Sequence, residues 1–216
     1  MAGLTPDIGA FLARLVRLDP KALVRVKVVS DEHCALWAVL PWRVLVSRTV
    51  NRSLVVGLAA DDVTVTAAEW LARADGDLAA VARQDAAWRG ALPPGAGAVR
   101  ETIETKVVRD IAAAAESTLR AVTAGALGDR AVGSRAVRDA LLDHVPLVVE
   151  HGGERIDVSQ RLIQAVARMG FLGADEDPCR IRTIASWTGV SAAYGVAWGK
   201  PQNALSPTLL PGPVRL

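Results

Sequence analysis

The chain has 216 residues, of which 51% are hydrophobic and 22% are charged. This balance is typical of a folded globular protein, because disordered chains are poor in apolar residues and rich in charge. The formal net charge is only +2, so the charge of the whole molecule does not require a nucleic acid or an anionic membrane as partner.

The basic residues are strongly biased toward arginine, with 21 Arg and 4 Lys. Together with the many Ala, Val and Gly residues, this bias is typical of GC-rich coding, as in actinobacteria. Selection of Arg for two-pronged contacts with phosphate or carboxylate is the alternative interpretation. Cys34 and Cys179 are too few for a disulfide framework and are expected to pack as small hydrophobic residues.

The first half of the chain predicts an antiparallel meander with covering helices. Thr5 and Pro6 are typical of a helix start, and apolar residues then recur at helical spacing as far as residue 18. Strands are predicted at 24–28, 34–39 and 44–50, and weaker ones at 54–58 and 63–65. Thr66 and Glu69 have the spacing of a capping box, so a helix is expected to follow through Trp70 and Leu71, with another helical stretch at 77–88.

A Pro- and Gly-rich segment at 92–98 is the best candidate for a linker. We therefore predict one α+β subdomain at 1–92, a second at 99–200 and an irregular, Pro-rich tail at 201–216. The alternative is that the two subdomains pack tightly enough to count as one domain.

The second half predicts a helical subdomain with two β-hairpins, which makes the whole chain α+β. After an extended piece at 99–103, helices are expected at 106–124, 134–143 and 159–169. Gly170 is expected to end the last helix, and Asp157 with Gln160 has the spacing of a second capping box. The hairpins are predicted at 147–158, around Gly152 and Gly153, and from strands at 180–184 and 190–198. The apolar face of the first helix is predicted to consist of Val107, Val108, Ile111, Ala115, Leu119 and Val122.

The sequence offers no recognisable catalytic, cofactor or metal site. His33 follows Asp31 and Glu32, but a zinc site needs at least three converging ligands, and no second cluster would supply them. The glycines before Lys200 lack the spacing of a phosphate-binding loop. No catalytic residue is assigned, and neither a metal nor a cofactor is expected.

Two surfaces are candidates for binding. Trp187, Tyr194 and Trp198 belong to a segment whose predicted strand has Gly195, Ala197 and Gly199 on its other face, and that bare face admits a helix or a flat ligand. Packing in the core is the favoured interpretation of these aromatic residues.

The second candidate surface is basic and consists of Arg161, Arg168, Arg180 and Arg182. A helix followed by a hairpin, with arginines on both, is how winged-helix proteins contact DNA. The acidic run at 175–177 lies between them, and a solvated face is the favoured interpretation.

For function, these observations favour a cytoplasmic, non-enzymatic interaction module that binds a protein or a nucleic acid. The longest uncharged run, 183–199, is too short to span a membrane, so no membrane association is expected. An enzyme or a small-ligand-binding protein that uses the region from Trp187 to Trp198 is the first alternative. A structural subunit of a homo-oligomer is the second.

Overall fold

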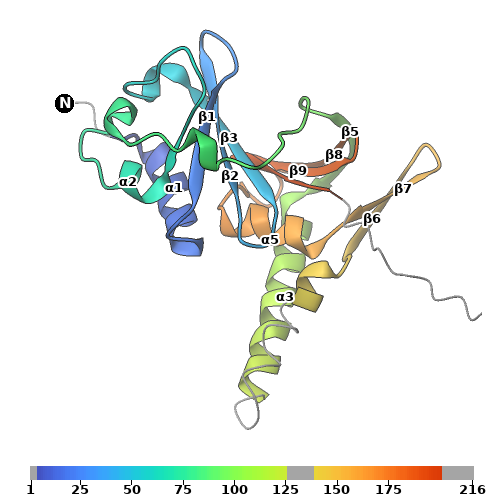
Figure 1. Cartoon of the computed structure of the whole chain (residues 1–216). Coiled ribbons are helices and arrows are strands. Elements are labelled where there is room, and N and C mark those ends of the chain that lie inside the picture. The colour runs from blue at the N-terminus through green and yellow to red at the C-terminus, as the bar shows by residue number, and fades with distance from the viewer. Residues whose placement is uncertain (1–3, 126–138, 201–216) are drawn as a thin grey trace, which may run out of the picture.

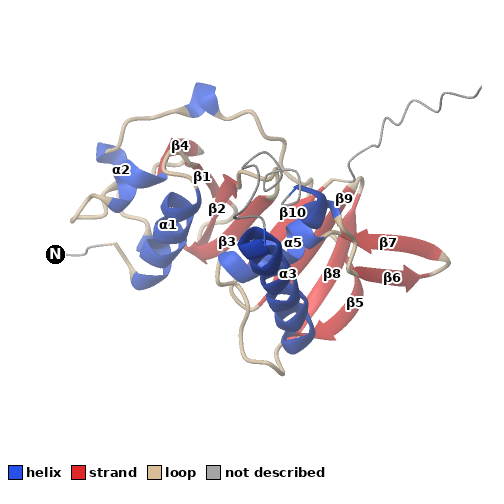
Figure 2. Cartoon of the chain, turned by 90° about the horizontal axis from the view of Figure 1, so that it is seen from below, coloured by secondary structure: helices blue, strands red, loops and turns tan. Residues whose placement is uncertain are grey.

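The computed structural model describes residues 4–125 and 139–200, and its centre is an eight-stranded antiparallel sheet. The strand order is β4-β1-β2-β3-β10-β9-β8-β5, and helices lie on one face of the sheet (Figures 1 and 2). This arrangement confirms the predicted α+β class. No helix within the described ranges is long and apolar enough to cross a membrane.

The sheet consists of β1 (Leu23–Val28), β2 (His33–Val39), β3 (Leu45–Asn51), β4 (Val63–Thr66), β5 (Ala98–Glu104), β8 (Pro178–Ile184), β9 (Trp187–Ala192) and β10 (Gly195–Gly199). A separate hairpin consists of β6 (Leu147–His151) and β7 (Glu154–Val158). The α-helices are α1 (Pro6–Leu18), α2 (Ala67–Leu71), α3 (Thr105–Gly125) and α5 (Gln160–Arg168), and residues 139–143 are also helical. Three short 3-10 helices are η1 (Arg52–Leu54), η2 (Leu78–Ala80) and η3 (Asp85–Ala87).

Helix α1 and strands β1 to β3 form as predicted. Ile8, Phe11, Leu12 and Leu15 are buried, which is the one-sided pattern that a helix covering a sheet requires. The Thr5 side chain, however, makes no capping hydrogen bond. In β1 the buried residues alternate with basic ones, so one face of the strand contacts the helices and the other carries charge.

Two predictions in the first half are wrong. Residues 54–58 do not form a strand, because the chain turns at Gly57, which has a φ of +75°. The helix expected through Trp70 and Leu71 forms as α2, but the helical stretch expected at 77–88 contains only two short 3-10 turns. Asp77 accepts the backbone N–H of Ala79, and such local side-chain bonds compete with a continuous helix. Thr66 does not cap α2 with its side chain either.

Residues 82–97, which we call the strap, cross from one edge of the sheet to the other on the face opposite to the α-helices (Figure 1). At the β4 edge, Gln84 N–H donates to the Thr64 carbonyl, and Thr64 N–H donates to the Asp85 carboxylate. At the β5 edge, Gly97 lies against the Trp198 ring. The predicted linker is therefore the last part of a segment that contacts the sheet at both of its ends.

Helix α3 forms as predicted, but its buried face is rotated from the predicted one. Val108 and Ala112 are buried, whereas Val107 is 42% exposed and Ile111 is half-buried. The side chain of Val122 and residues 134–138 of the next predicted helix lie outside the described residues, as does the tail at 201–216.

The end of α5 confirms the role predicted for Gly170. This glycine has a φ of +64°, its N–H donates to Ala167, and Phe171 N–H donates to Val166, which together form a Schellman motif. At the start of α5, Ser159 occupies the cap position, and Asp157 instead pairs with Arg155 in β7, so the second predicted capping box is wrong.

The region after α5 contains three strands rather than the predicted pair, because the chain turns at residues 193–194 between β9 and β10. The bare face of β10 contacts α5 and the segment after it: a Cβ on Gly195 would lie 2.7 Å from the Phe171 ring. The predicted close approach is therefore that of a helix and its C-terminal turn, as in a packed core.

The two halves share one sheet and one core. Strand β3 of the first half pairs with β10 of the second, from Ser47 with Val196 to Leu45 with Trp198. The buried residues of both halves form a single cluster, in which the rings of Phe11 and Phe171 stack with centroids 6.3 Å apart.

Candidate binding groove

A groove of about 1150 Å³ lies at one end of the sheet, where β2, β8 and β10 end and β3 and β9 begin. The start of α5 and the β6–β7 hairpin form its other walls. We call it the end groove. The lining residues used below are Trp42, Arg43, Arg100, Asp143, Glu154, Arg155, Asp157, Arg161, Thr183, Ala185, Trp187 and Lys200.

Two backbone conformations in this lining are unfavourable. Arg43 has a φ of +65° and Ala185 has a φ of +49°, and they are the two non-glycine residues with positive φ within residues 4–125 and 139–200. Each such conformation costs energy that the surrounding structure must supply, and such residues gather at functional sites. Arg43 ends the turn between β2 and β3, and Ala185 lies in the turn between β8 and β9. Both turns face the same groove.

The lining carries more positive than negative charge. Arg161 pairs with Asp143 at 2.6 Å and Arg155 pairs with Asp157 at 2.8 Å, which neutralises both arginines. The lining then contains three further cations but only one further carboxylate, that of Glu154.

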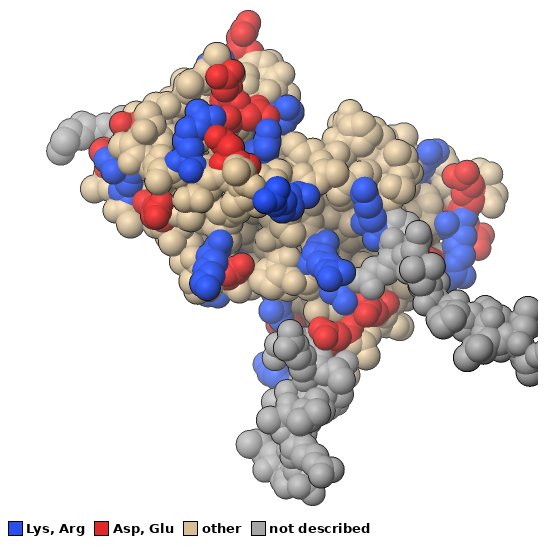
Figure 3. Space-filling view, viewed as in Figure 1, with Lys and Arg blue, Asp and Glu red and all other residues tan. Residues whose placement is uncertain are grey.

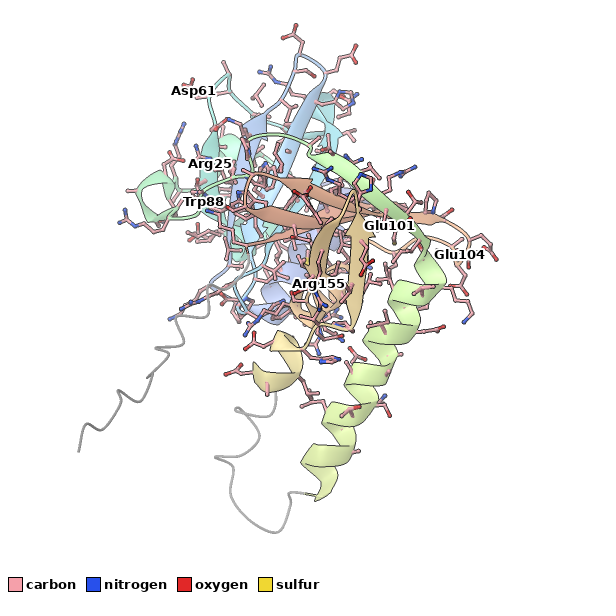
Figure 4. The ribbon with its side chains drawn as sticks, turned by 90° about the vertical axis from the view of Figure 1, so that its right-hand side faces the viewer. Arg25, Asp61, Trp88, Glu101, Glu104 and Arg155 are labelled. Atoms are coloured by element: carbon pink, nitrogen blue, oxygen red, sulfur yellow. The ribbon has the colours of Figure 1, made fainter. Side chains whose placement is uncertain are left out.

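Arg43, Arg100 and Lys200 have no carboxylate partner in the part of the chain that the structure describes. Arg100 Nε donates to the Thr183 hydroxyl at 2.7 Å, which fixes the guanidinium beside β8. Lys200 Nζ lies 4.7 Å from the centroid of the Trp187 ring, a cation–π contact. Figure 3 shows basic side chains spaced around the hollowed middle of the visible face, and Figure 4 shows Arg155 on the hairpin.

Trp42 joins the two halves of the chain at the floor of this groove. Its indole N–H donates to the Arg161 carbonyl at 3.2 Å, and Arg161 Nη1 donates back to the Trp42 carbonyl at 3.0 Å. Arg168 lies over the same ring at 5.7 Å. Two of the four predicted arginines therefore make contacts within the chain that hold the β2–β3 turn against α5.

The other two predicted arginines lie on the opposite face of the sheet. Arg180 and Arg182 alternate in β8 with the buried residues Cys179 and Ile181, which face the helices. Arg182 Nη1 donates to the carbonyls of Ala96 and Gly97, so it holds the end of the strap. Arg180 is exposed. The four arginines thus do not form one surface, because α5 packs on the sheet face opposite to the one that carries Arg180 and Arg182.

The three predicted aromatic residues are also separated. Trp187 is half-buried and lines the end groove. Trp198 is only 3% exposed and packs against Gly189 and Gly97. Tyr194 lies in the β9–β10 turn, 51% exposed, with Arg48 5.7 Å from its ring.

The sequence reasoning missed Trp42, Arg43 and Arg100 as groove residues. Pro41 predicts only a break between two strands, and it assigns no role to the residues that follow. A tryptophan in a tight turn between two strands is nevertheless a usable signal, since such a large apolar side chain is rarely left in solvent.

The groove offers charge and aromatic surface for binding. Both thiols are buried away from it, and burial raises the pKa of Cys34 and of Cys179, so both stay protonated at neutral pH. Among the described residues, no group of three or more His, Cys, Asp or Glu side chains is placed to hold a metal ion.

Comparison with solved structures shows a known fold. The DNA polymerase III subunit beta of Pseudomonas aeruginosa is 11% identical with a TM-score of 0.53, and the alignment covers 90% of this chain and 62% of that one. The beta subunit from the DNA polymerase of Streptococcus pyogenes is also 11% identical, with a TM-score of 0.55, and the alignment covers 92% of this chain and 62% of that one. A DNA polymerase sliding clamp from Pseudomonas aeruginosa is 12% identical, with a TM-score of 0.53, and the alignment covers 90% of this chain and 62% of that one. The chain thus spans about 62% of the length of these proteins, and at this identity the likeness shows the fold alone.

Comparison of sequences identifies the family. No curated protein matches the chain. A family model described as a domain of unknown function (DUF8010) matches residues 2–91, and another, also described as a domain of unknown function (DUF8185), matches residues 92–204. Because the second model covers more than half of the 216 residues, the chain belongs to the DUF8185 family.

Proposed function

We propose that the chain is a non-enzymatic interaction module that binds nucleic acid in the end groove. The observation that carries this proposal is the set of three cations without carboxylate partners in the described chain, Arg43, Arg100 and Lys200, around one hollow. Cations that are already paired with carboxylates offer little to a phosphate, whereas these three can each neutralise one. Arg43 and Arg100 can in addition hold two phosphate oxygens at once.

The positions of these cations support a backbone-binding role. They come from three distant parts of the chain: the β2–β3 turn, β5 and the end of β10. A strained backbone at Arg43 is maintained where the surrounding structure fixes it, here by hydrogen bonds between Leu40 and Val44 and between Arg43 and Leu40. The guanidinium that a side-chain hydrogen bond fixes is that of Arg100, whose Nε donates to the Thr183 hydroxyl, and a fixed guanidinium loses less conformational entropy on binding than a mobile one.

The likeness to sliding clamps of DNA polymerases is compatible with this proposal but does not carry it, because it concerns the fold. An acidic protein segment is the second candidate occupant, since a carboxylate accepts the same two hydrogen bonds from an arginine as a phosphate does. The same experiment distinguishes the two occupants.

The test compares the wild-type chain with the triple variant Arg43→Ala, Arg100→Ala, Lys200→Ala. Binding of a fluorescent single strand of about 20 nucleotides and of the matching duplex is measured by anisotropy between about 50 and 300 mM salt, conditions chosen so that phosphate contacts are visible. We expect wild-type affinity to fall steeply with salt. The triple variant should bind more weakly. The slope of the logarithm of its binding constant against the logarithm of the salt concentration should be flatter. We expect a change of about 0.7 on a single strand, and of about 0.9 on duplex DNA, for each phosphate that the variant no longer neutralises.

The matched control is the triple variant Lys21→Ala, Arg52→Ala, Arg120→Ala. It also removes three positive charges, from one lysine and two arginines that lie outside the groove. It therefore separates the effect of the groove residues from the effect of the lower net charge. Equal weakening in both triple variants would contradict the proposal. Absence of nucleic-acid binding at the lowest salt concentration, together with binding of an acidic peptide such as polyglutamate, would favour the second candidate.

A further inference from the structure

We infer that the end groove binds single-stranded nucleic acid, with one base stacked on Trp187 and an adjacent phosphate held by Lys200. This inference rests on the proposed function and specifies the ligand of the same groove. It follows from the position of the Trp187 ring in the groove and from its indole N–H, which has no hydrogen-bond partner among the described residues.

Trp187 presents both a ring and a hydrogen-bond donor to the groove. The residue is half-buried, and its indole N–H has no hydrogen-bond partner within the described residues. The N–H is not among the fully buried, unpartnered atoms either. The Trp187 ring contacts the Lys200 ammonium, which itself forms no ion pair in the described chain. A cation beside an aromatic ring is how proteins hold a base and its phosphate together.

The other tryptophans are already committed to the fold. Trp42 donates to Arg161 and lies under Arg168. Trp70 is fully buried and donates to Gly76 at 3.0 Å, and Trp88 donates to Gly90 at 2.6 Å. Trp198 is 3% exposed beneath the strap, and Trp37 does not line the groove.

The strand register explains why Trp187 and Lys200 meet although they are distant in sequence. Thr188 pairs with Gly199 across β9 and β10, so the residue before Thr188 and the residue after Gly199 are neighbours at the open end of the sheet. The turn before Trp187 contains Ala185 with its positive φ, and Ile184 pairs with Trp187 to close it. The ring is therefore held by a tight, paired turn and not by a long loop.

Single strands fit this arrangement better than a duplex. Stacking on an indole requires an exposed base face, which a base-paired duplex does not present along its length. The projecting part of the molecule that could enter a duplex groove is the β6–β7 hairpin, since a two-stranded ribbon fits the major groove. Its tip carries Glu150 and Glu154 around Gly152 and Gly153, and these carboxylates repel phosphate.

The test uses the full chain, a fluorescent oligothymidine of about 20 nucleotides, an abasic strand of the same length and a blunt duplex. We expect Trp187→Ala to bind oligothymidine about 5- to 150-fold more weakly, which is the range for loss of one stacked base. Trp187→Phe should keep most of the affinity because phenylalanine retains a ring. In both Trp187 variants the dependence of affinity on salt concentration should keep its wild-type slope, because all phosphate-binding side chains remain.

Two further measurements do not depend on how well Trp187→Ala folds. The wild-type chain should bind the abasic strand more weakly than oligothymidine. Its tryptophan fluorescence should be quenched by oligothymidine, and Trp187→Phe should show much less quenching. The inference is wrong if the abasic strand or the duplex binds as tightly as oligothymidine. In that case salt-dependent binding that needs Arg43, Arg100 and Lys200 would still support the proposed function, whereas absence of nucleic-acid binding even at the lowest salt concentration would overturn both proposals.

Discussion

Trp42 shows how one side chain holds the two halves of the chain together. Its indole N–H donates to the Arg161 carbonyl. We expect Trp42→Phe to lower the free energy of unfolding by about 1 kcal/mol, because this partly buried hydrogen bond no longer forms. Trp187→Phe is the control, since the N–H of Trp187 has no partner among the described residues. Chemical denaturation measures both, and equal destabilisation would show that the Trp42 bond contributes nothing specific.

The candidate site shows what single residues reveal in advance. The sequence marks Trp187 as a candidate, and this residue lines the end groove. The sequence cannot show that Arg161 and Arg168 make internal contacts, because their partner Trp42 is more than a hundred residues earlier in the chain. Periodicity places a residue on a face of its own element and does not say which distant segment covers that face. The role of Arg43 in the groove is hidden for the same reason.

At the scale of the element, β10 depends on glycine where α5 and its C-terminal turn approach. A Cβ at Gly195 would lie 2.7 Å from the fully buried Phe171 ring. Gly195→Ala should therefore lower the free energy of unfolding by about 1–3 kcal/mol, the usual cost of overpacking a core.

Gly9→Ala is the matched control for this substitution. Gly9 lies inside α1, and a Cβ there would meet Leu4 at 3.5 Å, an ordinary contact. Alanine in a helix interior is more favourable than glycine by about 0.5–1 kcal/mol, so this variant should be more stable than the wild-type chain. Thermal and urea unfolding measures whether the two substitutions change the free energy of unfolding in opposite directions. Destabilisation by both would mean that α1 tolerates no added methyl group at Gly9.

The elements themselves were largely predictable because their signals are local. Helix α1, strands β1 to β3, helices α3 and α5 and the β6–β7 hairpin follow from apolar spacing and from turn residues. The failures have local and non-local causes. The helical stretch expected at 77–88 gives way to short turns, in which the carboxylates of Asp77 and Asp85 accept hydrogen bonds from nearby and distant backbone amides. The rotation of α3 depends on α5 and β8, which the sequence of α3 alone does not contain.

At the scale of the whole molecule, the arrangement of the two halves was beyond sequence reasoning. The Pro- and Gly-rich segment at 92–98 suggested a break between two units, and the family models also meet at residues 91 and 92. Yet β3 pairs with β10, and the strap crosses the sheet from β4 to β5. Long-range strand pairing of this kind leaves no mark in composition or periodicity.

This continuity predicts how the chain responds to a single cut. Arg89 lies in the strap and trypsin can cleave after it, so limited digestion should give a nick there early. We expect the two fragments to stay together in size-exclusion chromatography under native conditions and to separate in urea. They remain joined by the β3–β10 pairing, by the hydrogen bonds between Trp42 and Arg161 and by the shared core. Separate elution of the fragments without denaturant would mean that the halves are independent domains. First cleavage within α3 instead, with the strap intact, would show that the strap is protected by the sheet that it crosses.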